Sequence, residues 1–286
     1  MRIAVITAKP MLYSHGRLIE AAEQRGHRLD TITVADNAVS IPEPRPSATH
    51  DAVILRHGTT RTNFGMAILR QFELAGVWPL NPSAAISSSR NKFHCLQILS
   101  NNGLNIPLSA YSEDQMQAEA LLQAVGGPPA VIKVLDGAHG VGVELCRTRA
   151  DAIATFDAFY REEGNVMMQE FITEAKGSDI RCIVIGGKFV AAMRRQGAVG
   201  EFRSNLHQGG SAHPVEATDD EKLAAERAAQ IMELNFCGVD MLRSDRGPLI
   251  IEVNSSPGLE GIEAVTGLDI ASDVIDCIER RIGSVS

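Results

Sequence analysis

The sequence contains no apolar run that approaches the roughly 18 residues needed to cross a membrane. Its first residues, MRIAVITAKP, become polar too soon for a secretory signal peptide. Low-complexity segments and convincing internal repeats are lacking as well. These absences predict a soluble, cytoplasmic protein with no membrane partner.

Excess basic charge and closely spaced cysteines are also missing. The 286 residues include 27 Lys and Arg against 35 Asp and Glu, which gives a formal net charge of −8. Non-specific nucleic-acid binding needs a basic surface, so we expect no direct nucleic-acid partner. The cysteines are odd in number and lack metal-ligand spacing, which predicts reduced, mostly buried thiols. They are Cys95, Cys146, Cys182, Cys237 and Cys277.

The apolar content, 44%, is sufficient for a substantial core in two domains or three small ones. Over the first 90 or so residues, short apolar runs alternate with helical patterns, which predicts a parallel sheet with helices on its faces. The expected strands are RIAVIT, LDTITV, DAVILR and VWPLN, and the expected helices cover residues 16–25, 64–75 and 83–103.

Hairpins replace crossovers in the middle of the chain. The strands AVIKVLDG and ELCRT are separated only by a glycine loop, which predicts an antiparallel sheet. Further helices are expected at about 114–124, 150–162, 219–234 and 270–282. The predicted fold class is therefore an N-terminal α/β domain followed by α+β units, with expected domains at 1–92, 93–172 and 173–286.

The most informative segment is 237–261, which reads as two short strands joined by a turn. Glu252 and Asn254 are two residues apart and so lie on one face of their strand. Together with Asp240 they supply three hard oxygen donors, which suit Mg²⁺ bridged to substrate phosphates. A solvated hairpin with charged tips is the alternative, but the apolar residues between the donors argue against it.

The register of this hairpin follows from its proline. We expect Ser244 to Pro248 in the loop, because a proline cannot donate to a strand ladder. Arg243 then pairs with Leu249, and Asp240 lies opposite Glu252 on the same face.

Lys133 and the glycine loop after it indicate a phosphate site. Lys133 lies between apolar residues in a strand, and a buried lysine needs a negative partner; the alternative is an edge-strand lysine that blocks aggregation. In GAHGVG, Gly140 and Gly142 allow backbone N–H groups to approach phosphate oxygens. The loop lacks the GK[ST] ending of a Walker loop, and a strand follows it, so neither a P-loop nor a dinucleotide fingerprint fits.

Two further segments contain candidate nucleotide contacts. In QEFI, the strand containing Gln169, Glu170, Phe171 and Ile172 could bind an adenine edge through its backbone, with apolar side chains around the ring. Asp179 and Arg181 could hold a ribose hydroxyl and a phosphate, or could form an ordinary surface ion pair.

The segment EFRSNLHQGGSA contains the candidate for charge stabilisation during transfer. Arg203 offers a planar fork suited to carboxylate or phosphate, and Asn205 has the same parity. His207 could act as a base, although a single loop histidine more often only forms a hydrogen bond.

Together these features resemble the ATP-grasp carboxylate–amine ligases, and within them the RimK-like glutamate ligases, which add glutamates to the C-terminus of a small-subunit ribosomal protein. The resemblance spans nearly the whole chain. Its most specific segments are RHGTTRTNFGMAILRQFELAG, QEFITEAKGSDIRC, GEFRSNLHQGGSA, GVDMLRSDRGPLIIEVNSSPGLEGIE and TGLDIA.

The resemblance implies an ATP-grasp fold in which two antiparallel sheets enclose ATP. It also implies a two-step reaction: a carboxylate attacks the γ-phosphate to give an acyl phosphate, which an amine then displaces, leaving ADP. By this resemblance, Lys92 and Lys133 match lysines at the phosphates, Gln169 to Ile172 match an adenine clamp, and Asp179 matches a nucleotide-contacting acid. Arg203, Ser204 and Asn205 match an RSN segment near the phosphates. Asp240, Glu252 and Asn254 match magnesium ligands.

The resulting hypothesis is an ATP- and Mg²⁺-dependent ligase for L-glutamate, with two Mg²⁺ ions expected and Mn²⁺ as a substitute. Its acceptor is a ribosomal protein C-terminus, making it a protein-modification enzyme, or a glutamate peptide that grows to poly-α-glutamate. The alternatives are a sister ligase acting on a coenzyme or carrier protein, and a non-catalytic nucleotide sensor. A homotetramer is expected from the resemblance alone.

Glutamate specificity does not follow from the residues themselves. Several arginines could recognise two carboxylates, but any acidic substrate would satisfy them equally. They are Arg203, Arg56, Arg61, Arg194 and Arg195.

Overall fold

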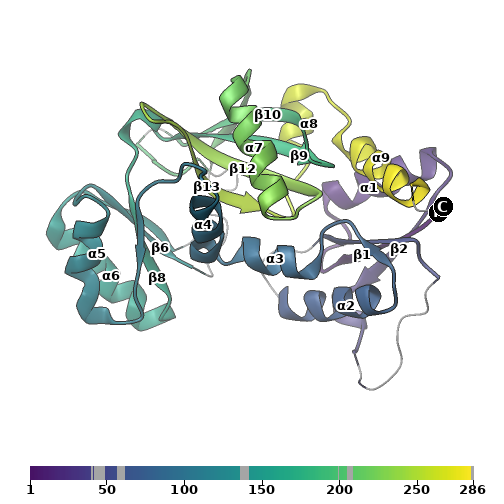
Figure 1. Ribbon diagram of the computed structural model, residues 1–286, viewed down its shortest axis with the longest axis horizontal. Helices are drawn as coiled ribbons and strands as arrows, with labels where there is room; N and C mark the ends of the chain where they lie inside the picture. The colour runs from purple at the N-terminus through teal and green to yellow at the C-terminus, as the bar shows by residue number, and fades with distance from the viewer. Residues whose placement is uncertain are drawn as a thin grey trace.

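The computed structural model describes residues 1–39, 41, 49–56, 62–135, 142–198, 200–204 and 209–284. Within these ranges, three sheets are arranged along the long axis of the molecule (Figure 1). No helix in the described part of the chain is both long and apolar enough to cross a membrane.

The first sheet is parallel, as the alternation of strands and helices predicts, with the order β2-β1-β3-β4. Its strands and helices are β1 (Arg2–Thr7), β2 (Arg28–Thr33), β3 (Ala52–Arg56), β4 (Trp78–Pro79), α1 (Tyr13–Gln24) and α2 (Thr62–Leu74); a short 3₁₀ turn, η1 (Val34–Asp36), follows β2. Ile3 of β1 packs with Leu18 of α1, whereas Ile6 packs with Leu69 of α2. The helices therefore cover opposite faces, and β1 is buried on both.

The prediction of one helix over 83–103 is wrong, because two helices, α3 (Ser83–Arg90) and α4 (Lys92–Asn101), occupy this segment. Asn91 between them has an extended backbone, and its Oδ1 accepts a hydrogen bond from the His94 N–H at 2.9 Å. Asparagine is a preferred N-cap because it satisfies such a donor. The break places Lys92 at the start of α4.

The second sheet is antiparallel with the order β5-β8-β6-β7, which confirms the predicted hairpin. Its elements are β5 (Ser109–Tyr111), β6 (Ala130–Val134), β7 (Val143–Cys146), β8 (Val166–Glu170), the 3₁₀ turn η2 (Gln115–Gln117), α5 (Ala118–Ala124) and α6 (Arg149–Glu163). Ile132 and Met168 pack against Phe156 of α6. The alternation of side chains then turns Lys133 and Gln169 toward the opposite face.

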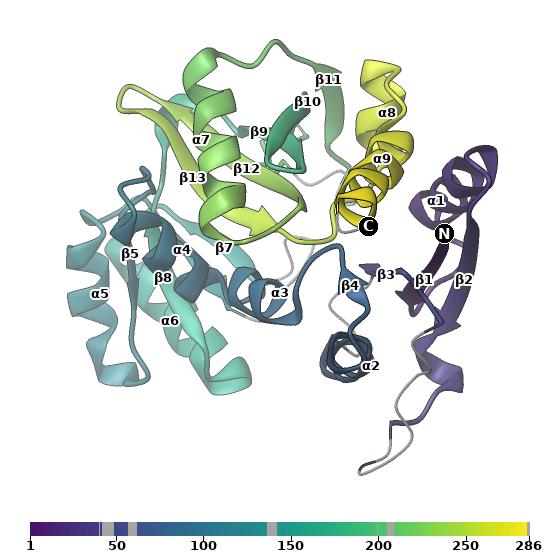
Figure 2. The same ribbon diagram turned by 45° about the vertical axis from the view of Figure 1, so that its right-hand side comes forward.

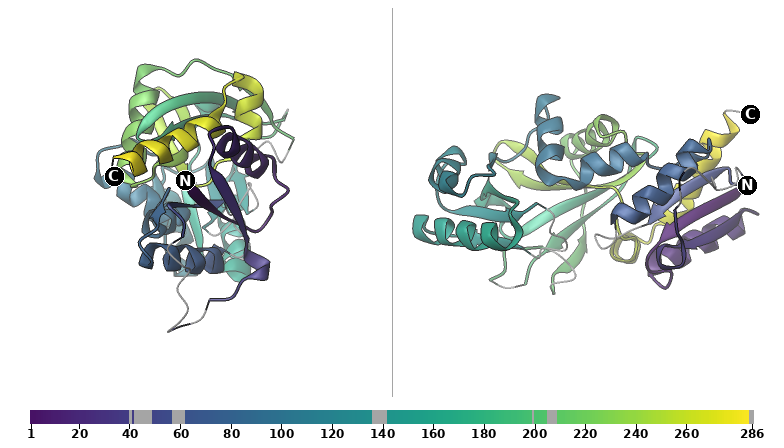
Figure 3. Two further views of the ribbon diagram at one scale, coloured as in Figure 1. Left: turned by 90° about the vertical axis from the view of Figure 1, so that its right-hand side faces the viewer. Right: turned by 90° about the horizontal axis from the view of Figure 1, so that it is seen from below.

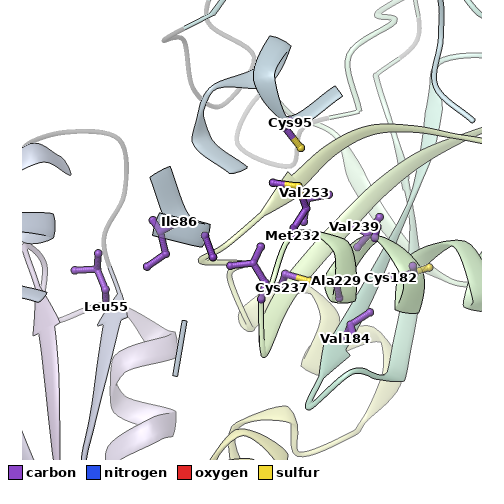
Figure 4. Close-up of a cluster of buried hydrophobic side chains, with 14 of the residues drawn as sticks. Leu55, Ile86, Cys95, Cys182, Val184, Ala229, Met232, Cys237, Val239 and Val253 are labelled. Atoms are coloured by element: carbon purple, nitrogen blue, oxygen red, sulfur yellow. The ribbon is translucent and has the colours of Figure 1, made fainter. Parts of the chain in front are cut away.

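The third sheet is antiparallel with the order β11-β10-β9-β12-β13. Its elements are η3 (Thr173–Ala175), β9 (Ser178–Ile185), β10 (Lys188–Gln196), β11 (Ser211–Pro214), α7 (Asp219–Ile231), β12 (Phe236–Ser244) and β13 (Gly247–Asn254). Val184 and Val239 pack against Ala229 of α7, and the same cluster continues through Ile86 to Leu55 of β3 (Figure 4). One apolar core therefore joins the first and third sheets.

The other face of the third sheet is divided. At one end Ile183 and Phe236 pack against Ile275 of α9. The covering helices are α8 (Glu260–Thr266) and α9 (Ile270–Gly283), and α9 lies beside α1 (Figure 2). The end toward the second sheet is polar and carries the site described below. Seen from below, the second sheet and the first lie at opposite ends of the molecule (Figure 3).

Candidate functional site

A cavity of about 160 Å³ lies between the second and third sheets. Its lining combines apolar side chains with a set of lysines, arginines and carboxylates from both sheets. The residues named as candidates from the sequence that line it are Lys92, Lys133, Gln169, Glu170, Phe171, Ile172, Asp179, Arg195, Arg203, Ser204, Asp240 and Glu252. The structure therefore brings together residues separated by up to 160 positions in the chain.

Asp179 is buried and held from two sides. Arg195 of the neighbouring strand donates to it twice, from Nε to Oδ1 at 2.7 Å and from Nη2 to Oδ2 at 2.5 Å. Ser204 Oγ donates to Oδ2 at 2.5 Å. The alternative of a surface ion pair between Asp179 and Arg181 is wrong, because Asp179 is buried and pairs with Arg195, whereas Arg181 pairs with Asp240.

Asp240 is the second buried acid, with 2% of its surface exposed. Arg181 donates to it through Nε and Nη2, both at 2.7 Å, and Arg195 Nη2 adds a third bond at 2.8 Å. Burial alone would favour the neutral acid, but the two guanidinium groups hold the pKa of Asp240 below its usual value. The carboxylate therefore stays ionised at neutral pH.

The hairpin confirms that Asp240 lies opposite Glu252, but the predicted register at the turn is wrong. Arg243 pairs with Pro248, not with Leu249, and a bulge after Asp240 restores the expected alignment. The proline is tolerated within the strand because β13 is at the edge of the sheet and its missing N–H breaks no inner ladder.

Lys133 contacts neutral groups in this structure. Its Nζ donates to Gln169 Oε1 at 2.6 Å, and Gln169 in turn donates to Ser109 Oγ at 2.8 Å. Burial lowers the pKa of Lys133 to about 8, and nearby Glu252 acts in the opposite direction. Lys92 Nζ lies close by and donates to the Leu135 carbonyl at 2.8 Å.

The segment expected to clamp adenine, Gln169 to Ile172, comprises the last two residues of β8 and the two residues after it. The Glu170 carboxylate accepts two bonds at 2.8 Å from Arg246 Nη2 in the β12–β13 turn, which links the second and third sheets. Ile172 is buried, and Phe171 meets Phe202 edge to face with ring centroids 6.4 Å apart. An apolar slot of this kind can accept a flat ring.

Arg203 also lines the cavity. It forms an ion pair with Glu201 at 2.8 Å and donates to the Val143 carbonyl at 3.3 Å. These contacts connect the segment after β10 to the start of β7, so Arg203 borders both sheets. Among the other candidates, Gly140, Asn205, His207 and Arg61 lie outside the described residues.

Two arginines offered for substrate carboxylates donate hydrogen bonds within the protein. Arg195 donates hydrogen bonds to Asp179 and Asp240, as described above. Arg56 is partly buried, donates from Nη2 to the Pro257 carbonyl at 2.7 Å and lies over the Phe236 ring. Arg194 is exposed on β10.

The donor set can accept a divalent cation. An ionised carboxylate has about four lone-pair directions, and Asp240 uses three of them, which leaves one on Oδ1. The Glu252 carboxylate forms no hydrogen bond or ion pair with another described residue, and Asn254 Oδ1 accepts one bond, from the Ser256 N–H at 2.9 Å. No cluster of three His, Cys, Asp or Glu side chains suited to a metal occurs in the described ranges. Asp240 and Glu252 line the cavity, whereas Asn254, two residues beyond Glu252 at the end of β13, is not part of the lining. A metal held by these residues would therefore need ligand oxygens as well.

Four residues at the site were not predicted from the sequence. Val131 and Leu242 supply apolar lining, Phe202 faces Phe171, and Arg246 joins the two sheets. The period of two in β6 and β12 places Val131 with Lys133 and Leu242 with Asp240, so strand parity could have identified the first two. The contacts of Phe202 and Arg246 join elements that are distant in sequence, and no local pattern indicates them.

Gly142→Ala should destabilise the protein more than Gly164→Ala. Both glycines have left-handed backbones, with φ of +70° and +74°, so alanine strains either one by about 1 kcal/mol. Only at Gly142 would the added Cβ meet a neighbour, Val134 Cγ2 at 2.8 Å. We expect chemical denaturation to give a loss of about 2–3 kcal/mol for Gly142→Ala. Equal losses for the two variants would contradict the close approach of β6 and the glycine loop.

The sequence matches two family models. The RimK-like ATP-grasp domain matches residues 89–278, and the RimK PreATP-grasp domain matches residues 1–86.

Curated relatives match along the whole chain. A probable alpha-L-glutamate ligase of Aliivibrio fischeri is 50% identical over 288 residues, covering 98% of this chain and 96% of the relative. A protein of the same description from Azotobacter vinelandii is 49% identical over 289 residues, with the same coverage.

Solved structures share the fold at low identity. D-cycloserine synthetase DcsG superimposes with a TM-score of 0.77 at 17% identity and covers 99% of this chain and 100% of that one. The ATP-grasp ligase PsnB, complexed with minimal precursor, gives a TM-score of 0.75 at 22% identity, over 97% of this chain and 98% of that one. These structures confirm the expected architecture.

Proposed function

The chain belongs to the RimK-like ATP-grasp family of ATP-dependent ligases, and on that premise we propose that it joins L-glutamate to a carboxylate chain end. One observation carries the proposal: Lys133, Asp179 and Glu252, from two antiparallel sheets, line a single cavity. That combination can neutralise phosphates and present oxygen ligands to a cation, which are the main requirements of phosphoryl transfer.

ATP is proposed to bind with its adenine along the end of β8 and the two residues after it, from Gln169 to Ile172. Backbone groups of this strand would read the edge of the base, and Phe171 and Ile172 would pack on its faces. Asp179 retains a lone pair on Oδ1 for a ribose hydroxyl. The phosphates would meet Lys92 and Lys133, together with Gly140, Gly142 and the Arg203–Ser204–Asn205 segment.

Asp240, Glu252 and Asn254 are proposed to hold Mg²⁺, with two ions per site and Mn²⁺ as a substitute. The bound metal would neutralise phosphate charge and orient the γ-phosphate. Lys133 would stabilise the same charge from the second sheet, and its neutral contacts leave it available to exchange Gln169 for a phosphate oxygen. Arg203 would stabilise the charge that develops on the transferred group.

The reaction follows from this arrangement. The acceptor carboxylate takes the γ-phosphoryl group to give an acyl phosphate and ADP, and the amine of glutamate then attacks the acyl carbon and releases phosphate. No protein nucleophile is needed, because the site works by positioning and by neutralising charge. Water must be excluded from the acyl phosphate, which is the role proposed for the glycine loop between β6 and β7.

The acceptor is proposed to be the C-terminus of a ribosomal protein, or a glutamate peptide that is elongated. We also propose that the protein is a homotetramer and that residues 1–92, 93–172 and 173–286 form three functional units. The test is mass spectrometry of products formed from MgATP and each amino acid in turn, without a protein acceptor.

A ladder of glutamate oligomers with stoichiometric ADP is the expected result. The matched control is the Glu252→Gln protein, which should form the ladder about 10²–10³-fold more slowly. ADP formation with another amino acid but none with glutamate would overturn the proposed substrate. If no amide forms from any amino acid, ribosomal proteins are the next acceptors, and failure with those as well would leave the nucleotide-sensor alternative.

A further inference from the structure

Arg195 links two acids that lie on different strands. Its side chain is 5% exposed and starts from β10, beside Asp179 on β9. The guanidinium group also reaches across β9 to Asp240 on β12, where Nη2 lies 2.8 Å from Oδ2. One buried side chain therefore contacts both the acid assigned to the nucleotide and an acid assigned to the metal.

The charges of this cluster cancel. Asp179 and Asp240 carry two negative charges, and Arg181 and Arg195, which donate to them, carry two positive ones. The remaining acid of the metal site, Glu252, lies near the lysine Lys133. A divalent cation approaching without a nucleotide therefore meets no net negative charge, and repulsion by the guanidinium groups is strong where water is largely excluded.

A nucleotide would reverse this balance. Its polyphosphate brings several negative charges into the cavity, and these attract the cation and at the same time engage the lysines. Arg195 remains fixed by Asp179 through two bonds, so the position of Asp240 is maintained while the ligands enter.

We propose that Arg195 is a positioning residue that fixes Asp179 and Asp240 and suppresses metal binding until nucleotide phosphates are present. The inference rests on the proposed function, because the metal and nucleotide sites belong to it. A purely structural role for Arg195 would predict only lower stability when it is replaced, with no gain in affinity for metal.

The test measures Mn²⁺ binding to the nucleotide-free protein by electron paramagnetic resonance. Arg195→Gln removes one positive charge beside Asp240, so Mn²⁺ affinity should rise by at least about tenfold. The control is Arg161→Gln, an exposed arginine in the last turn of α6, which should bind Mn²⁺ as the wild type does. An Arg195→Gln protein that is folded by circular dichroism but shows wild-type Mn²⁺ affinity would overturn the inference.

The Arg195→Lys variant tests the geometry of the side chain separately from its charge. It can also be measured if the Arg195→Gln protein does not fold. Lysine keeps the charge but cannot bridge both acids with a planar fork. Mn²⁺ binding without nucleotide should therefore stay as weak as in the wild type, while affinity for ADP should fall by about tenfold. Increased Mn²⁺ affinity in this variant, or unchanged ADP affinity, would contradict the proposed role.

The wild-type protein with ADP present distinguishes failure of the inference from failure of the proposed function. Mn²⁺ should bind the protein tightly in this mixture and only weakly without ADP. If Mn²⁺ binds equally well without nucleotide, the inference is wrong and the metal site stands. If Mn²⁺ does not bind even with ADP, the proposed metal site itself is wrong.

Discussion

Glu252→Gln should lower the rate of ligation by about 10²–10³-fold and leave the stability of the fold nearly unchanged. The Glu252 side chain lines the cavity, but its carboxylate forms no hydrogen bond or ion pair with another described residue. Glutamine has the same shape, so packing is preserved while the charge available to a cation is lost. Steady-state ADP release and thermal denaturation of the same preparation measure the two quantities.

Asp240→Asn is the informative comparison, because it should lose both activity and stability. Asp240 is buried against Arg181 and Arg195, and the substitution removes the charge that compensates them. Breaking a buried ion pair from one side typically costs about 3–5 kcal/mol. Equal stability of the Asp240 and Glu252 variants would show that the arginines do not depend on Asp240. Wild-type ligation by Glu252→Gln would refute the metal assignment.

Lys133→Met should abolish ligation and at the same time raise the stability of the nucleotide-free protein. Burial lowers the pKa of Lys133 from 10.5 to about 8, which means that folding penalises its charged form. At 1.36 kcal/mol per pKa unit the penalty is about 3 kcal/mol, and loss of the bond to Gln169 offsets about 1 kcal/mol of the gain. We expect chemical denaturation at pH 7 to show a net gain of about 2 kcal/mol.

The gain in stability from Lys133→Met should become smaller as the pH rises. Between pH 8 and pH 10.5 the unfolded state holds the Lys133 proton while the folded state has released it, so the stability of the wild type rises with pH. The penalty is fully present below about pH 8 and fades as the pH approaches 10.5. The advantage of Lys133→Met over the wild type should therefore be smaller at pH 9 than at pH 7. Comparing the two proteins at each pH cancels titrations that they share.

The exposed lysine Lys188, at the start of β10, provides the control. Lys188→Met should change neither ligation nor the pH dependence of stability. A stability gain from Lys133→Met that is the same at pH 7 and pH 9 would mean that packing of the methionine, and not the buried charge, explains it. Destabilisation at pH 7 would contradict the lowered pKa.

Local pattern was sufficient for most of the elements. The parallel first sheet and the antiparallel hairpin at Lys133 follow from the spacing of apolar runs and turn residues, which are properties of neighbouring positions. The division of residues 83–103 into two helices was missed, because the N-cap at Asn91 lies inside an uninterrupted helical pattern. The register at Pro248 was also missed, since a proline is compatible with a strand only at a sheet edge, and edge position is not a local property.

The sequence by itself determined which residue types could form the site and that Asp240, Glu252 and Asn254 belong to one hairpin, because strand periodicity places side chains on faces. Only the tertiary structure decided how the acids are paired. Arg195 is 16 residues from Asp179 and 45 from Asp240, and it meets them only because β10, β9 and β12 are adjacent in the sheet. Strand order depends on the packing of the whole core, so the buried charge network at the centre of the site had no counterpart in any local pattern.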